Sequence, residues 1–193
     1  MADLLDPDLL SAIDAIPGRA FSGSVRRVTW ASRDPLAANH GGGRWSPDGR
    51  FEVLYTSLEA DGALAEVYYH LSRAPVMSSS HMRLNQLNAT LKNVLALTTE
   101  QLRELGVDDP LASRIDSHQG RAVGEAAFML DFQGLIVPSA RWDCNNLVLF
   151  TDRIELNKDI HLQHQAEINW PAWRERADKM HKLIQDLESR AQL

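Results

Sequence analysis

The residues best suited to chemistry begin at a run of three glycines that leads into an arginine, Gly41-Gly42-Gly43-Arg44. Backbone without Cβ atoms lets a ligand approach closely, and a guanidinium group beside exposed N–H groups is well suited to phosphate. The stretch also fits a plainer interpretation, a flexible loop followed by a surface arginine that stacks on Trp45. It matches neither common glycine-rich phosphate motif, because no Gly-Lys-Ser/Thr follows and the G-x-G-x-x-G spacing is absent.

A second candidate is Glu66, which lies in a largely apolar stretch that runs from Ala63 to Leu71 and is predicted to be helical. A helix that is apolar on most of its sides is largely buried. A buried carboxylate must be paired or must face a pocket. Glu66 therefore either forms a salt bridge, to Arg73 or another cation, or is held in a cleft for chemistry.

Two hydroxyl-bearing residues complete the set of candidates. Tyr55 lies in a predicted strand, where it either packs in the core or acts on a ligand, by stacking on a ring or by hydrogen-bonding a ribose. Ser139 follows a short apolar strand, and it either closes a turn or faces a ligand. Ser139 does not match a hydrolase nucleophile, because the Gly-x-Ser-x-Gly pattern is absent.

Composition excludes several classes of function. The chain of 193 residues carries a formal net charge of −6, which argues against a general nucleic-acid-binding surface. Its one cysteine, Cys144, cannot build a cysteine-based zinc site, and the seven histidines show no metal-binding spacing, so no metal is expected. The N-terminal segment is acidic and lacks the basic region of a secretory signal. No apolar run reaches the roughly 18–20 residues that span a bilayer. The sequence therefore predicts a cytoplasmic protein that binds neither membrane nor nucleic acid directly.

Apolar patterning predicts strands and helices that are interspersed along the chain. The predicted helices span residues 3–15, 60–72, 99–105, 117–130 and 171–191, and the predicted strands span 24–30, 51–56, 135–137, 147–150 and 160–168, with one or two more in 81–98. A chain of this length suits one domain. Because the strands are short and often adjacent, we expect an α+β domain of short-stranded sheets flanked by helices, with a long C-terminal helix.

Over roughly residues 25–155 the chain resembles the RES domain family, which is named for its Arg, Glu and Ser motifs. The motifs that carry the resemblance are, in order, Gly-Gly-Gly-Arg44-Trp45-Ser-Pro-x-Gly, Leu54-Tyr55-Thr-Ser, Ala63-Leu64-Ala65-Glu66-Val67, Val137-Pro138-Ser139-Ala140-Arg141 and Asn146-Leu-Val-Leu-Phe150. The resemblance implies a fold similar to that of the ADP-ribosyltransferase toxins and NAD+ as the substrate. It also implies the toxin of a bacterial toxin–antitoxin pair, with an Xre-like helix-turn-helix antitoxin as partner.

The family's site residues fall on Arg44, Tyr55, Glu66 and Ser139, with Arg27 on the first strand as a further arginine. Cleavage of a nicotinamide–ribose bond passes through an oxocarbenium-like transition state. By residue type, Glu66 suits the ribose, the arginines suit the pyrophosphate and Tyr55 suits the nicotinamide end, while Ser139 suits a hydrogen bond to ribose or carboxamide. Water as acceptor gives hydrolysis of NAD+, and a protein acceptor gives ADP-ribosylation. The alternative is a non-catalytic module that binds a phosphorylated ligand.

Overall fold

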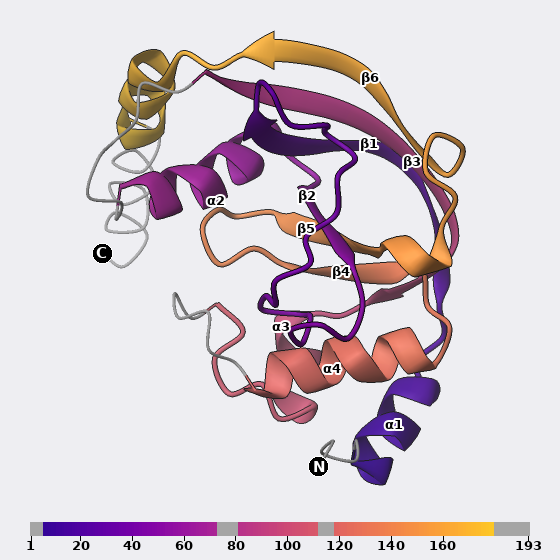
Figure 1. Ribbon diagram of the computed structural model, residues 1–193. Coiled ribbons are helices and arrows are strands. Elements are labelled where there is room, and N and C mark those ends of the chain that lie inside the picture. Colours follow the sequence, from indigo (N-terminus) through magenta and orange to yellow (C-terminus); the bar gives the residue numbers. More distant parts are fainter. Residues whose placement is uncertain (1–5, 73–80, 112–117, 180–193) are drawn as a thin grey trace, which may run out of the picture.

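The computed structural model describes residues 6–72, 81–111 and 118–179, and these contain one six-stranded sheet with helices on both sides (Figure 1). The strands are β1 (Arg19–Trp30), β2 (Val53–Ser57), β3 (Met82–Ala96), β4 (Gly134–Pro138), β5 (Asn145–Phe150) and β6 (Ile160–Glu167). Their order is β1-β2-β5-β4-β3-β6, and β1 also pairs with β3, so the first five strands close into a ring. Only β3 and β4 run parallel among these pairs.

The prediction of short strands is wrong for β1 and β3, which have 12 and 15 residues. They form one antiparallel ladder from Arg19–Val94 to Trp30–Met82. The segment 81–98 yields a single strand because Asn85, a residue type common in turns, is satisfied inside the sheet. Its Nδ2 atom donates to the Arg27 carbonyl and its Oδ1 atom accepts from Gln165. The other edge of β3 pairs first with β6 and then with β4.

The core lies on both faces of the sheet, as alternation along the strands requires. All five strands of the ring contribute to one buried cluster, which includes Val25, Leu54, Leu87, Ile136 and Leu147. The opposite face of β4 and β5 packs against α1 (Pro7–Asp14) and α4 (His118–Met129), which lie beside one another in Figure 1. The short helix α3 (Thr99–Glu104) begins at a capping box formed by Thr98 and Gln101.

The helix α2 (Ala60–Leu71) packs against β1 and β2 and carries Glu66. Its outer side receives the C-terminal segment, of which residues 170–179 are helical. Trp173 is buried there, contacts the ring of Tyr68 and donates from its indole nitrogen to Asp61 at 2.9 Å. The first part of the predicted helix over residues 171–191, up to residue 179, is helical in the structure. Its remaining residues, 180–191, and the first residues of the predicted helix 3–15 lie outside the described ranges.

Within the described ranges, no helix has both the length and the apolar character needed to cross a membrane. The architecture is thus the expected single α+β domain, built around one closed sheet rather than several short ones. The similarity to the ADP-ribosyltransferase toxin fold stays a prediction.

A close backbone contact connects this framework to the loop that carries Arg44. The Cα atom of Gly124, on α4, faces the carbonyl group of Trp45, and a Cβ atom at position 124 would overlap that oxygen. Glycine at this position therefore lets α4 support the loop directly, without a side chain between them.

Replacing Gly124 by alanine is expected to lower the melting temperature, although alanine is the better helix former. The new methyl group forces α4 or the loop to move, and overpacking of this kind typically costs about 1–3 kcal/mol. Thermal unfolding of the purified variant measures the effect. At the control position Gly41 an added Cβ meets nothing within 4 Å, so Gly41→Ala should leave the melting temperature unchanged. An unchanged value for Gly124→Ala would show that α4 does not support the loop.

Candidate active site

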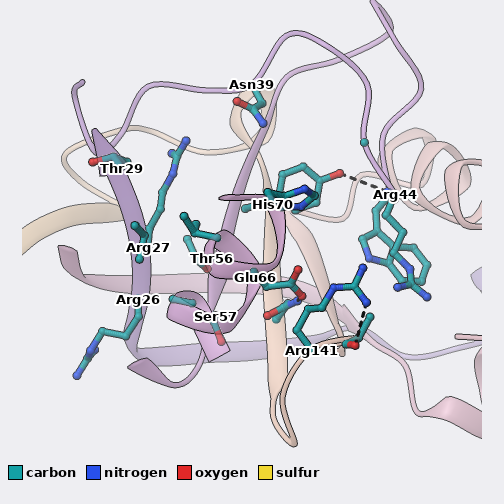
Figure 2. Close-up of a pocket in the computed structure, with 18 of the residues that line it drawn as sticks. Arg26, Arg27, Thr29, Asn39, Arg44, Thr56, Ser57, Glu66, His70 and Arg141 are labelled. Atoms are coloured by element: carbon teal, nitrogen blue, oxygen red, sulfur yellow. Dashed lines mark hydrogen bonds between the residues drawn. The ribbon is translucent and has the colours of Figure 1, made fainter. Parts of the chain in front are cut away.

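A cavity of about 450 Å³ opens between β1, β2, α2 and the loop that contains Arg44 (Figure 2). Its size falls within the range of about 300–1,000 Å³ that is common for small-molecule sites. Four of the five predicted site residues line it, namely Arg27, Arg44, Tyr55 and Glu66. The fifth, Ser139, is buried directly behind the Glu66 carboxylate and hydrogen-bonded to it. The structure therefore brings together residues that are up to 112 positions apart, because the closed sheet places β1, β2 and the end of β4 around one helix.

Tyr55 supports the loop that carries Arg44. Its hydroxyl accepts a hydrogen bond from the Trp45 backbone N–H at 3.3 Å and is hydrogen-bonded to Ser46 Oγ at 3.2 Å. A Cβ atom at Gly43 would overlap the same hydroxyl, so glycine is required there for the approach of Tyr55. Burial raises the pKa of the Tyr55 hydroxyl, so Tyr55 stays neutral at physiological pH. Contact between Tyr55 and a ligand stays a prediction.

The Arg44 side chain is half-buried and contacts a segment that is distant in the sequence. One of its terminal nitrogens donates to the carbonyl groups of Asp109 and Pro110, which lie beyond α3. The guanidinium carbon lies 5.4 Å from the centroid of the Trp45 ring, which is itself buried. Loss of solvation lowers the pKa of Arg44, while the nearby charge of Glu66 acts in the opposite direction. Arg44 is therefore a charged group held inside the cavity rather than a mobile surface arginine.

Arg27 holds the loop before Arg44. It is 8% exposed, and its terminal nitrogens donate to the carbonyl groups of Pro35 at 3.0 Å and Ala37 at 2.9 Å. Burial lowers its pKa to about 10, so it remains a cation at neutral pH. The geometry thus assigns Arg27 a structural contact that the sequence did not predict, and its contact with a pyrophosphate stays a prediction.

Glu66 is held by hydrogen bonds and not by an ion pair. Its Oε1 atom accepts from Ser139 Oγ at 3.0 Å and from Asn146 Nδ2 at 3.3 Å. Across the described residues, no cationic nitrogen lies within 4.0 Å of this carboxylate. Arg73, the cation considered in the sequence analysis, lies outside the described ranges. Of the two interpretations, the geometry therefore favours a carboxylate held in a cleft.

Ser139 has both of its hydrogen-bonding roles filled. Its hydroxyl donates to Glu66 and accepts from the backbone N–H of Arg141 at 3.2 Å. Its own backbone N–H donates to the Cys144 carbonyl, which closes the turn between β4 and β5. Ser139 therefore closes a turn, which is one of its two expected roles, and it also contacts Glu66, which the sequence did not predict. A hydrogen bond from Ser139 to ribose or carboxamide stays a prediction.

Two residues of the site were quoted as parts of motifs but not predicted to function there. Asn146 lies beside Val137 in the sheet and reaches Glu66. Arg141 lines the cavity, and its guanidinium lies 3.5 Å from the centroid of the Tyr69 ring, a cation–π contact that fixes its direction. The signal for both was their position at the facing ends of two apolar strands, but the sequence does not reveal which strands are neighbours.

The assembled chemistry consists of one carboxylate and several cations around a cavity of ligand size. The positive charge of Arg141 lies close enough to Arg44 to lower the pKa of the Arg44 guanidinium. Such a pair favours a ligand that carries more than one negative charge. In the described part of the chain, no cluster of three or more His, Cys, Asp or Glu side chains could hold a metal ion. The residues present are therefore suited to binding an anionic ligand and to stabilising a developing positive charge.

Known proteins share this sequence pattern. The family model for the RES domain matches residues 17–174. The proteins named NAD(+) phosphorylase MbcT from Mycobacterium bovis and Mycobacterium tuberculosis are 35% identical over 148 residues, which cover 72% of this chain and 80% of theirs.

The structural comparison agrees with the sequence comparisons. The crystal structure of the MbcT–MbcA toxin–antitoxin complex of M. tuberculosis contains a chain that superposes with a TM-score of 0.76 and 30% identity. The match covers 89% of this chain and 98% of that one. The family model spans both the cavity and the sheet that frames it, and the resemblance found in the motifs is thereby confirmed: this chain belongs to the RES domain family.

Proposed function

We propose that this protein is the toxin of a bacterial toxin–antitoxin pair and that it destroys NAD+ by transferring its ADP-ribosyl group to inorganic phosphate. The observation that carries the proposal is the Glu66 carboxylate, held by Ser139 and Asn146 at a cavity lined by arginines. The similarity to proteins named NAD(+) phosphorylase supports phosphate as the acceptor. Water and protein acceptors, which the sequence analysis considered, are the competing outcomes.

The proposed reaction breaks the bond between C1″ of the ribose and the nicotinamide nitrogen. The bonding electron pair leaves with nicotinamide, which becomes neutral, and a phosphate oxygen forms the new bond to C1″. The products are nicotinamide and ADP-ribose 1″-phosphate. Because positive charge grows on the ribose as the bond breaks, a carboxylate that is already oriented stabilises the transition state without reorganisation. Glu66 is the carboxylate placed for this role.

The arginines of the cavity supply positive charge for two anionic groups, the pyrophosphate of NAD+ and the attacking inorganic phosphate. Arg44 is assigned to the pyrophosphate of NAD+, because it is half-buried and held in place through its contacts to Asp109 and Pro110. Arg141 lines the same cavity and adds a second cation on the side of Glu66 that faces Arg44 in Figure 2. A guanidinium group binds phosphate oxygens through paired N–H donors, which suits both groups.

An antitoxin is the proposed partner, because the similar solved chain was crystallised as a toxin–antitoxin complex. A protein segment that covers the opening of the cavity between Arg44 and Glu66 would exclude NAD+ directly. An Xre-like helix-turn-helix protein is proposed for this role, and binding to DNA is assigned to that partner. The proposed site of action is the cytoplasm, where NAD+ and phosphate are both present.

Product analysis tests the function. The purified protein is incubated with labelled NAD+ in a phosphate-free buffer and again with added phosphate. We expect nicotinamide release to depend on phosphate and the labelled product to be ADP-ribose 1″-phosphate. Free ADP-ribose in both buffers would show hydrolysis instead, and label on added lysate proteins would show ADP-ribosylation. Binding of NAD+ without any turnover would favour the non-catalytic module.

Loss of the Arg44 guanidinium is expected to weaken NAD+ binding. Hydrogen bonds to charged groups contribute about 1.5–3 kcal/mol, so Arg44→Ala should raise the dissociation constant about 10- to 100-fold. Arg44→Lys should restore it only in part, because the forked geometry is lost. Titration calorimetry in a Glu66→Gln background keeps turnover low, and Arg103→Ala, at an exposed position on α3, is the control. Equal affinity for Arg44→Ala and its parent would exclude the pyrophosphate assignment.

Loss of the Glu66 charge is expected to affect turnover far more than binding. Glu66→Gln keeps the shape of the side chain but removes the charge, and deletion of one preorganised electrostatic group typically lowers kcat on the order of 10²–10³-fold. The dissociation constant of NAD+ should change little, and the variant should no longer arrest growth when expressed alone. Glu59→Gln, at an exposed position just before α2, is the matched control. A destabilised but fully active Glu66→Gln would remove this residue from the mechanism.

A further inference from the structure

Both hydrogen bonds that hold Glu66 end on the same oxygen atom. Ser139 Oγ and Asn146 Nδ2 donate to Oε1 at 3.0 and 3.3 Å. Neither donates to Oε2, and the carboxylate group lies at the cavity wall. A carboxylate held by one oxygen keeps the lone pairs of the other available, so this pattern separates the oxygen that anchors Glu66 from the oxygen that can face a substrate.

The Asn146 amide is oriented as a hydrogen-bond donor to Glu66. Its Nδ2 atom faces Glu66, whereas its Oδ1 atom is buried and has no hydrogen-bond partner among the described residues. Leaving a buried acceptor unpaired is costly. The opposite amide orientation would direct Oδ1 at the carboxylate, which is favourable only if Glu66 carries a proton to donate. The observed orientation therefore suits an ionised Glu66, although it leaves the Oδ1 atom of Asn146 without a hydrogen bond among the described residues.

The backbone at Asn146 is rigid because β5 lies between two strands. Asn146 pairs with Ser57 of β2 on one side and with Val137 of β4 on the other. Ser139 follows two residues after Val137, so both donors to Glu66 are positioned by the same antiparallel pair of strands. Side chains on paired central strands move little, which is the requirement for orienting a catalytic group within a fraction of an ångström.

We infer that Asn146 is a positioning residue, which acts with Ser139 to fix Oε1 of Glu66 and so present Oε2, ionised, to the ribose of the substrate. The inference rests on the proposed reaction for its catalytic consequence. The contact itself is independent of the reaction, because it is present without substrate. Asn146 accelerates the reaction through Glu66 and needs no contact with the substrate.

Other charged and titratable groups also face Glu66, so the effect of Asn146 must be measured against them. Arg44 approaches from the glycine-rich loop and Cys144 from the turn between β4 and β5, and both interact electrostatically with Glu66. Arg141 and His70 line the same cavity. None of these groups is removed by a substitution at position 146, so a change in pH dependence reports the lost hydrogen bond.

The test compares Asn146→Ala with wild type by kinetics and by titration. We expect kcat at neutral pH to fall about tenfold, consistent with the loss of one hydrogen bond to a charged group, and KM for NAD+ to stay within twofold. Without the donor, Glu66 binds a proton more readily, so the acid limb of the pH–kcat profile moves to higher pH. The carbon-13 signal of the Glu66 carboxyl group should show its titration midpoint moving in the same direction without substrate.

Two further variants sharpen the result. Asn146→Asp places a second carboxyl group beside Glu66, so the two compete for one proton; kcat should fall below that of Asn146→Ala, and the acid limb should move further. Asn145→Ala changes the preceding asparagine, which is exposed, and should behave as wild type.

The outcomes separate this inference from the proposed function. A wild-type protein that cleaves NAD+, with an Asn146→Ala variant of equal kcat, equal acid limb and equal carboxyl titration, would overturn the positioning role alone. A wild-type protein that does not cleave NAD+ would overturn the proposed function and the catalytic consequence together. In that case a shifted Glu66 titration in Asn146→Ala would still demonstrate the contact. Reduced kcat with an unshifted profile and titration would indicate a structural role and would also overturn the inference.

Discussion

The central constraint on this site is the stabilisation of one carboxylate charge. Glu66 lies on a helix that buries Ala63, Leu64 and Ala65, so its charge must be stabilised by groups from outside the helix. A cation in a salt bridge would offset the negative charge that the proposed chemistry needs. Neutral hydrogen-bond donors stabilise the carboxylate and leave that charge available to a substrate. Ser139 and Asn146 provide such donors, and the closed sheet brings their strands to α2.

The arginine side of the cavity depends on a different type of constraint, the close approach of backbone segments. Tyr55 supports the Arg44 loop through hydrogen bonds to Trp45 and Ser46, and Gly43 is needed for that approach. Gly124 allows α4 to contact the backbone of the same loop at Trp45. Gly43 therefore contributes to the packing of the loop, while the contacts to Asp109 and Pro110 hold the Arg44 side chain itself. A preorganised cation lowers the entropic cost of binding an anion.

Some of these features could be predicted from the sequence and others could not. The predicted helix bounds 60–72 and 117–130 agree with α2 and α4 to within one residue at each end. Apolar spacing and the residues that begin or end a helix are local signals, so they can be found in the sequence. Strand β3 was harder to predict, since Asn85 is satisfied only by neighbours from β1 and β6. Asn146 was missed as a site residue because its partner, Glu66, lies 80 positions away and is brought close only by strand order. Local patterns thus predict the elements, while contacts between distant elements require the fold.

The central claim is that NAD+ binds in this cavity with its reacting ribose at Glu66. The most direct measurement is a crystal structure of the Glu66→Gln variant, in which turnover should be strongly slowed, in complex with NAD+. The account predicts the pyrophosphate at the Arg44 guanidinium and C1″ of the nicotinamide ribose within contact distance of the side chain at position 66. NAD+ bound outside the cavity, or bound with its nicotinamide ribose turned away from position 66, would contradict the account.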